Sequence, residues 1–190
     1  MKKLLLVLIF ASIGFLAKAQ RLPIDTVNNA VIYSEVVFVD NIPKDELYTR
    51  AREWFARTFR SAQNVLQMDD KSAGKIIGKG NDRGSVYLAP LVASSFLERY
   101  TISITVKDGK YKYAIFDFTV QNDPYQGMQY PERVINEIAT NAKWKNDAGE
   151  YRKVVKGYIE TTIRINETLS SSLKVAMANQ SKGLKIKDDF

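Results

Sequence analysis

The sequence predicts an α+β domain in which a curved antiparallel sheet carries helices on one face. Three observations predict this class. Residues Ala30–Val39 are rich in β-branched and aromatic side chains, Lys44–Phe59 have helical spacing, and Asp108-Gly109 is a strong hairpin signal. The expected order is strand, helix, four strands and then helices. Because short links join the last four strands, we expect them to form an antiparallel meander.

Local pattern defines the first strand and the first helix. The strand ends at Asp40-Asn41-Ile42-Pro43, a combination that stops a strand and starts a helix. Lys44–Phe59 then gathers its apolar side chains on one face and leaves its arginines elsewhere. Asp45 and Glu46 lie in the first turn, where the helix dipole favours anions. The predicted buried face consists of Leu47, Ala51, Trp54, Phe55, Thr58 and Phe59.

The later strands follow from alternation and turn signals. They are expected at Val65–Met68, Lys75–Gly80, Tyr100–Lys107 and Lys110–Val120. The Tyr100–Lys107 strand alternates strictly between apolar and polar side chains, which indicates one buried and one solvated face. Glycines at 74, 78, 80 and 84 indicate bulges or close approach of neighbouring chains.

The Asp108-Gly109 turn also sets a register. It pairs Val106 with Tyr111, Ile104 with Tyr113 and Ile102 with Ile115, which puts all six side chains on one face. The next apolar set, Phe116, Phe118 and Val120, then falls on the other face. We infer a bulge near Ile115–Phe116 that restores the phase. The alternative is a strand that is covered on both sides.

The C-terminal third reads as helical. Pro131 should start a short helix that runs through Ile138, and Tyr151–Gln180 keep the mixed spacing of a long helix, with a possible break at Ser170–Ser172. The expected organisation is a leader over 20–29, one α+β domain over 30–146, a C-terminal helix over 147–181 and a charged tail over 182–190.

Residues 1–19 have the order of a secretory signal peptide. Met1-Lys2-Lys3 is a positive start, Leu4–Leu16 is apolar, and Ala17-Lys18-Ala19 fits the small-x-small cleavage pattern, with Gln20 as the new N-terminus. The apolar run is shorter than the roughly 20 residues that span a bilayer. No cysteine follows it for lipid attachment. We therefore expect a soluble product that is exported to the periplasm or beyond.

Composition excludes several chemistries. Of 28 basic residues, cleavage removes Lys2, Lys3 and Lys18, which leaves 25 against 21 acidic ones, a formal charge of +4. The sequence contains no cysteine and no histidine. Ser-His-Asp and Cys-His catalysis, disulfides and zinc sites built on these residues are therefore excluded. Carboxylate, lysine, tyrosine and serine–lysine chemistry remain.

Three blocks identify a family resemblance. They read YSEVVFVDNIPKDELYTRAREWFARTF, DDKSAGKIIGKG and YTISITVKDGKYKYAIFDF, and they cover most of residues 30–120. In these blocks the chain resembles secreted bacterial domains of unknown function that have a TATA-binding-protein (TBP)-like fold. The resemblance implies an exported β-α-β-β-β-β-α domain without established activity or catalytic residues, and its fold name does not imply DNA binding. The apolar Val86–Phe96 segment and the long C-terminal helix depart from the family pattern.

No motif in the sequence meets the requirements of a known site. The Gly74–Gly80 run lacks the spacing and the hydroxyl of a phosphate loop. Ser171–Lys174 matches S-x-x-K, but the companion motifs of penicillin-recognising enzymes are absent. Asp69-Asp70 and Asn81-Asp82 do not form a calcium loop. Asp117 lies between two phenylalanines, and we expect the bulge to turn it toward solvent.

Basic residues of the first helix and of the glycine-rich segment are interleaved with acidic ones. This pattern favours a salt-bridged surface over a nucleic-acid site. The segment Val86–Phe96 is apolar and contains Pro90, so it cannot be a central strand throughout. Two interpretations stay open. One is an exposed loop that presents an interaction surface; the other is a pair of strand ends that meet at a turn. The candidate surface consists of Leu88, Leu91, Val92 and Phe96.

The leading functional hypothesis is a non-enzymatic envelope protein that binds an envelope protein or a glycan. We expect no cofactor, no metal, no nucleic acid and no membrane anchor after cleavage. One alternative is a carboxylate-dependent enzyme that acts on glycans, which requires two Asp or Glu side chains facing each other in a cleft, roughly 5–9 Å apart. A second alternative is self-association into a homo-oligomer through the C-terminal helix.

Overall fold

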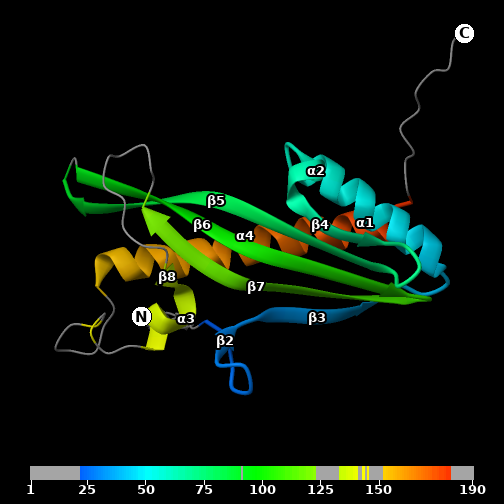
Figure 1. Ribbon diagram of the computed structural model, residues 1–190, viewed down its shortest axis with the longest axis horizontal. Helices are drawn as coiled ribbons and strands as arrows, with labels where there is room; N and C mark the ends of the chain where they lie inside the picture. Colours follow the sequence, from blue (N-terminus) through cyan, green and yellow to red (C-terminus); the bar gives the residue numbers. More distant parts are fainter. Residues whose placement is uncertain are drawn as a thin grey trace, which may run out of the picture.

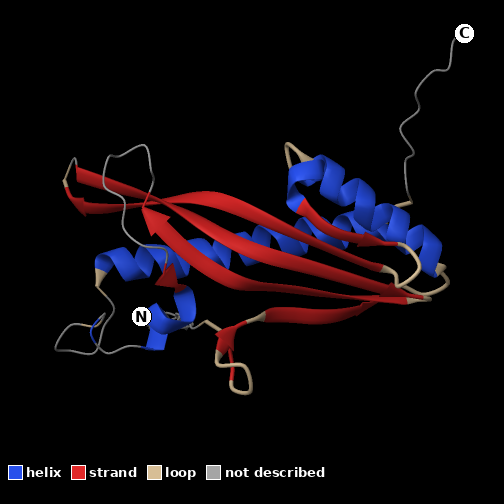
Figure 2. Cartoon of the chain, viewed as in Figure 1, coloured by secondary structure: helices blue, strands red, loops and turns tan. Residues whose placement is uncertain are grey.

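The computed structural model describes residues 22–90, 92–122, 133–140, 143, 145 and 152–180. A six-stranded antiparallel sheet forms its centre in the order β3-β7-β6-β5-β4, and β8 pairs with β7 (Figures 1 and 2). Its strands are β3 (Tyr33–Phe38), β4 (Leu66–Asp70), β5 (Lys75–Ala89), β6 (Val92–Lys107), β7 (Lys110–Asn122) and β8 (Arg133–Val134). The helices are α1 (Lys44–Thr58), α2 (Ala62–Val65), α3 (Ile135–Thr140) and α4 (Lys153–Ala178). The predicted α+β class and the meander of the last four strands are confirmed.

The N-terminal segment is more structured than expected. Within the predicted leader, β1 (Ile24–Asp25) pairs with β2 (Ala30–Val31) to form a small hairpin. The predicted strand Ala30–Val39 is divided at Ile32, whose N–H donates to the carbonyl oxygen of Pro23 (3.2 Å). The predicted signal peptide and the charged tail 182–190 lie outside the described residues.

Helix α1 follows its predicted bounds and packs with its apolar stripe against the sheet. Leu47, Ala51, Trp54 and Phe55 are buried, as predicted, whereas Thr58 at the end of the helix is exposed. Arg50 is buried, contrary to the prediction that the arginines point away from the core. It is buried because its Nη1 donates to the carbonyl oxygen of Met177 at the end of α4 (2.7 Å).

The β6–β7 hairpin has the predicted register. Its three apolar pairs join Ile102 to Ile115, Ile104 to Tyr113 and Val106 to Tyr111, and all six side chains are buried. The predicted bulge is present slightly later along the strand, where Arg99 pairs with Thr119 and Thr101 with Phe116. Asp117 absorbs the extra residue with a φ of 55° and is exposed, so Phe118 and Val120 return to the buried face.

Strand β5 is more than twice as long as the sequence predicted, because its glycines accommodate aromatic rings from β6. Gly80 pairs with Tyr100 and Gly84 pairs with Phe96 across the two strands. A Cβ atom at Gly84 would lie 2.2 Å from Cζ of Phe96 and 2.6 Å from Oγ1 of Thr161. The ring therefore covers the glycine backbone, and α4 packs directly above it.

Helix α4 contributes to the same core as α1. It runs without a break through Ser170–Ser172, where a break was considered. The Ser172 hydroxyl donates within the helix to the carbonyl oxygen of Leu169 (3.1 Å) and accepts from Nε1 of Trp54 (3.0 Å). Its buried residues include Val155, Ile165, Leu169, Leu173 and Met177. Each apolar side chain that is fully buried contributes on the order of 2 kcal/mol to the free energy of unfolding.

Replacing Gly84 tests the close approach of β5, β6 and α4. We expect Gly84→Ala to lower the free energy of unfolding by about 1–3 kcal/mol, because the Phe96 ring and α4 must move to admit the methyl group. Urea denaturation measures the change. Ser85→Ala, at the next and exposed position of the strand, is the control and should have little effect. An unchanged urea midpoint for Gly84→Ala would contradict the prediction, because it would show that the neighbouring side chains admit the methyl group without loss of stability.

Candidate functional site

The predicted interaction segment Val86–Phe96 consists of two strand ends that meet at a turn. β5 ends at Ala89 and β6 begins at Val92, which decides between the two interpretations. Phe96 is 1 % exposed and packs edge-on against Tyr158 of α4, with ring centroids 4.6 Å apart. Its assignment to an exposed surface was therefore wrong, since alternation along β6 turns it to the core. The side chains of Leu88, Leu91 and Val92 lie outside the described residues.

The motifs that resembled catalytic signatures are structural. Lys174 of the S-x-x-K match forms an ion pair with Glu35 (2.7 Å), so its partner is a carboxylate of β3. Gly78, Gly80 and Gly84 lie in the middle of β5 and face the buried side of the sheet. They do not form a loop that could hold a phosphate.

The acidic residues considered as ligands are occupied by neighbouring side chains. Asp69 accepts a short hydrogen bond from the Tyr48 hydroxyl and pairs with Arg52 (2.8 Å). Asp82 pairs with Arg164 of α4 (2.9 Å). Within the described ranges, no group of three or more Asp and Glu side chains is arranged to hold a metal ion.

A buried carboxyl group lies between β6 and α4. Glu98 is fully buried, and its Oε2 atom has no hydrogen-bond partner among the described residues. Burial raises the pKa of Glu98 to about 8, although hydrogen bonding to Thr162 and the charge of Arg164 oppose the shift. Sequence reasoning missed this residue. Alternation extended backward from Tyr100 would have placed both Glu98 and Phe96 on the buried face.

The hydroxyl of Thr162, the hydrogen-bond donor to Glu98, has two acceptors within reach. Oγ1 of Thr162 lies 2.5 Å from Oε1 of Glu98 and 3.0 Å from the carbonyl oxygen of Tyr158. A hydroxyl has one proton and cannot donate to both acceptors. If Glu98 is protonated, it donates to Oγ1 of Thr162, which then donates to Tyr158. The raised pKa of Glu98 agrees with this arrangement.

The glycan-hydrolase alternative requires two carboxyl groups in an open cleft. Asp82 and Glu98 lie directly opposite each other in the β5–β6 register. Glu98, however, is sealed beneath α4, and Asp82 is held by Arg164. A substrate cannot reach both groups in this arrangement, so this pair does not meet the requirement.

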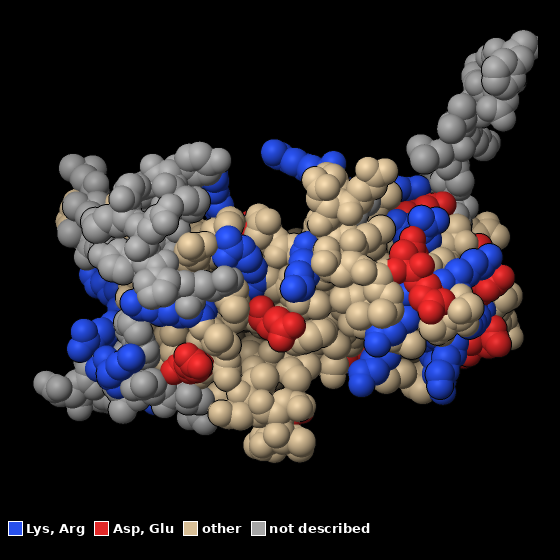
Figure 3. Space-filling model, in the orientation of Figure 1, with Lys and Arg blue, Asp and Glu red and all other residues tan. Residues whose placement is uncertain are grey.

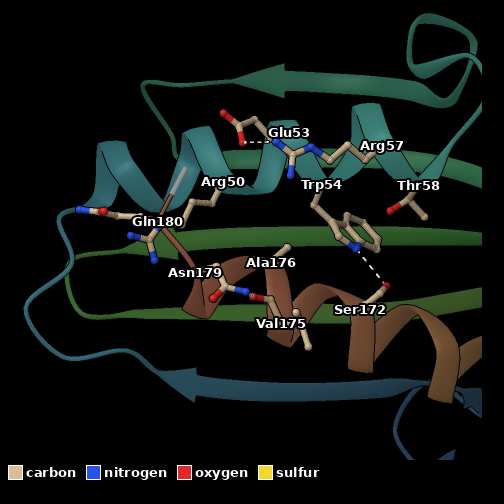
Figure 4. Close-up of a pocket in the computed structure, with 10 residues that line it drawn as sticks. All are labelled: Arg50, Glu53, Trp54, Arg57, Thr58, Ser172, Val175, Ala176, Asn179 and Gln180. Atoms are coloured by element: carbon tan, nitrogen blue, oxygen red, sulfur yellow. Dashed lines mark hydrogen bonds and ion pairs between the residues drawn. The ribbon is translucent and has the colours of Figure 1, made fainter. Parts of the chain in front are cut away.

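A groove of about 420 Å³ lies between α1 and the end of α4. Figure 4 shows Arg50, Trp54 and Arg57 from α1 on one side, and Val175 of α4 and Asn179, which follows its end, on the other. Both guanidinium groups pair with acids of their own helix, Arg50 with Glu46 and Arg57 with Glu53. Because these charges are already paired, a ligand in the groove would be held mainly by its fit to the groove and less by charge.

The opposite face of the sheet has a different character. We call it the open face, because α1 and α4 both lie on the other side; the strands lie in front of α4 in Figure 1. Alternation and register place on it the side chains of β5, β6 and β7 that point away from the core. Seven of these are basic, namely Lys75, Lys79, Arg83, Arg99, Lys107, Lys110 and Lys112. Against them stand Asp70 of β4 and Asp117 at the bulge.

The central row of the open face is polar, but its neighbours are mixed. Ser103 and Thr105 of β6 are partly exposed, whereas Thr101, expected on the solvated face, is buried beside Asp117, to which its hydroxyl donates. The flanking positions are Lys79, Ile77 and Lys75 on β5 and Phe116, Ala114 and Lys112 on β7. The five lysines of the face form no ion pair within the described part of the chain. In the same view, Figure 3 shows basic side chains spread along the molecule, while acidic ones gather mainly at the end where α1 lies.

A family profile matches residues 33–121, and its family is described as a domain of unknown function (DUF4468) with a TBP-like fold. Residues 33–121 form a DUF4468 domain. The resemblance and the TBP-like fold predicted from the sequence are thereby confirmed. The DUF4468 domain contains α1 and the five-strand path from β3 through β7 to β4, and therefore the whole open face.

Two solved structures resemble the chain beyond the DUF4468 domain. One is a DUF4468 family protein from Bacteroides ovatus, with a TM-score of 0.66 and 15 % identity, covering 84 % of this chain and 92 % of that one. The other is a TBP-like protein from Parabacteroides distasonis, with a TM-score of 0.63 and 21 % identity, covering 83 % and 99 %. At these identities the likeness shows the fold alone. A comparison with curated proteins gave no match.

The described helices were also compared with the requirements of a membrane span. None combines the length and the apolar character that crossing a bilayer demands.

The protonation of Glu98 gives a prediction about pH. Its folded pKa of about 8 lies above the ordinary value of 4.5, so between these values the folded state holds a proton that the unfolded state has released. The free energy of unfolding should therefore fall as pH rises through this window, by on the order of 1 kcal/mol per pH unit. Glu98→Gln cannot ionise and should flatten this fall. Denaturation from about pH 5 to 9 measures it, with the exposed Glu160→Gln as control. Parallel profiles for Glu98→Gln and the parent would contradict a titration of Glu98.

Proposed function

We propose that this protein is an exported binding protein of the bacterial envelope, without catalytic activity, which holds an anionic polysaccharide on its open face. One observation carries the proposal. Among the described residues, the face concentrates seven basic side chains against two acidic ones, whereas the mature sequence as a whole is nearly balanced. A surface of one sign attracts a polyanion and raises its local concentration.

The composition of the open face supports a sugar polymer as the ligand. Ser103 and Thr105 are partly exposed hydroxyl groups: Thr105 lies between Lys75 and Lys112, and Ser103 lies between Ile77 and Ala114. Hydroxyl groups hydrogen-bond to sugar hydroxyls and carboxylates, while lysines supply long-range attraction. Single-stranded nucleic acid would require aromatic side chains on which bases stack along the face. The exposed aromatic side chains among the described residues, Phe38 and Tyr87, lie instead near opposite ends of the sheet, since Phe38 pairs with Lys110 and Tyr87 with Ala93.

Export is the second part of the proposal, and Met1–Gln20 supports it through the signal-peptide pattern. We expect the full sequence, expressed in a bacterial host, to yield a periplasmic or secreted product that begins at Gln20. N-terminal sequencing and intact mass measure this. Replacing the apolar Leu8 by Arg should block export and retain the uncleaved chain. Recovery of a cytoplasmic product that still begins at Met1 from the parent sequence would contradict export.

Charge reversal tests the polymer site. Lys75→Glu combined with Lys112→Glu should weaken binding to polygalacturonate at least tenfold and reduce the dependence of binding on salt, because two cationic contacts are lost. The matched control reverses Lys153 and Lys156, which are exposed on α4 on the other side of the molecule. Titration at several salt concentrations measures both. Equal loss in the two double variants would contradict a specific face, and tighter binding of single-stranded DNA would contradict a sugar ligand.

A further inference from the structure

Among the described strands, none pairs with a long part of one edge of β5. β4 pairs with it only from Lys75 to Gly78, after which the chain of β4 leads back into α2. From Lys79 to Ala89, no described strand pairs with β5 on the side away from β6. Figure 1 shows β4 alongside one end of β5 only. Such an edge presents backbone N–H and C=O groups that an extended chain can pair with.

Beside this edge lies a hollow of about 840 Å³, in the lane that a longer β4 would occupy. Its walls are Thr58, Ser61 and Asn64 on the helical side and Gly80, Asn81 and Asp82 on β5. One backbone carbonyl of this edge already accepts a hydrogen bond from a side chain of α4. The donor is Nη2 of Arg164 and the acceptor is the carbonyl oxygen of Arg83 (3.3 Å). This long bond satisfies a group that elsewhere in the sheet would meet a neighbouring strand.

We propose that the edge of β5 from Lys79 to Tyr87 binds an extended acidic segment of another protein, which adds to the sheet as an antiparallel strand. Binding by strand addition takes its affinity from main-chain hydrogen bonds and its specificity from alternate side chains. On the open face those alternate positions are Lys79, Asn81, Arg83, Ser85 and Tyr87.

The spacing of the basic residues defines the partner. Lys79 and Arg83 are four positions apart on one face, so the added strand should carry two acidic residues four positions apart, each opposite one of them. Opposite charges that face each other across strands contribute about 0.2–1 kcal/mol each. A polar residue would lie opposite Asn81.

The same charges disfavour a second copy of this chain as the occupant. Two antiparallel β5 edges centred on Asn81 would put Lys79 of each copy opposite Arg83 of the other. Like charges in directly opposed positions destabilise strand pairing. The positive charges of Lys79 and Arg83 therefore disfavour pairing of two β5 edges and favour pairing with an acidic strand.

Register-specific cross-linking tests the proposal, because the chain has no cysteine of its own. The probe is a capped peptide of alternating Val and Thr, with two Asp residues placed opposite Lys79 and Arg83 and one Cys opposite Asn81. In the mature chain, Asn81→Cys should form a disulfide with this peptide at least tenfold faster than Ser103→Cys, which lies within the same face but between paired strands. Equal rates would overturn the proposal. Preferential formation of a disulfide-linked protein dimer would also overturn it, in favour of self-pairing.

Hydrogen exchange on the unmodified chain provides an independent measurement. The same peptide without Cys should slow exchange at residues 79–87 and leave β3, at the other edge of the sheet, unchanged. Equal protection of both edges would overturn the proposal.

Charge reversal on β5 completes the test. Lys79→Glu should weaken peptide binding at least threefold and favour a peptide with Lys in place of Asp. Lys75→Glu, which lies where β4 already covers the edge, should not. An equal effect of the two substitutions would overturn the proposal. Because Lys75 and Lys112 belong to the polymer test, the two proposals fail separately.

Discussion

The register of β6 is the constraint on which the rest of the structure depends. β6 pairs with β5 on one side and β7 on the other, and its even-numbered residues from Phe96 to Val106 all face the helices. Since side chains alternate with a period of two, a slip by one residue would expose this row and bury the polar one. The Asp108-Gly109 turn and the bulge at Asp117 hold the register, so they determine which face α1 and α4 cover.

This division separates the two sides of the sheet chemically. On the helix side, several charged groups are paired within the fold, as in the ion pairs of Arg164 with Asp82 and Lys174 with Glu35, although Lys153 and Lys156 are exposed on α4. Matched and partly buried charges have little left to offer a ligand. On the open face, the lysines remain without such partners among the described residues. The anion binding that we propose therefore uses the side of the sheet that the helices leave uncovered.

Local signals were sufficient for α1 and for the β6–β7 hairpin. In both, helical or alternating spacing coincides with a strong start or turn signal within a few residues. The length of β5 could not be predicted in this way, because glycines and charges have low strand propensity. Gly80 and Gly84 are stabilised by rings of Tyr100 and Phe96, which lie well ahead in the sequence. The burial of Arg50 likewise depends on the end of α4, 127 residues away.

The candidate surfaces were predictable in part for the same reason. Alternation from Tyr100 to Lys107 marks Thr101, Ser103 and Thr105 as a solvated row. It does not reveal that Lys75 and Lys112 flank Thr105, since that neighbourhood arises from pairing across three strands. The sequence left two interpretations of the apolar Val86–Phe96 segment open, because Pro90 and a short apolar run fit either an exposed loop or a turn between strands. Alternation extended backward from Tyr100 would have placed Phe96 in the core, and the register shows that it lies there.

Polar contacts explain why α4 rests at one position along the sheet. A slide of a helix by one turn moves its residues by about 5.4 Å. Four directional contacts exclude such a slide, since each requires one residue of α4 at one place. They join Thr162 to Glu98, Arg164 to Asp82, Ser172 to Trp54 and the carbonyl oxygen of Met177 to Arg50. The contact of buried Glu98 with Thr162 thus helps to fix the position of α4 along the sheet. With α4 fixed, Arg164 stays over Asp82 and the Arg83 carbonyl, beside the edge of β5 that lacks a partner strand.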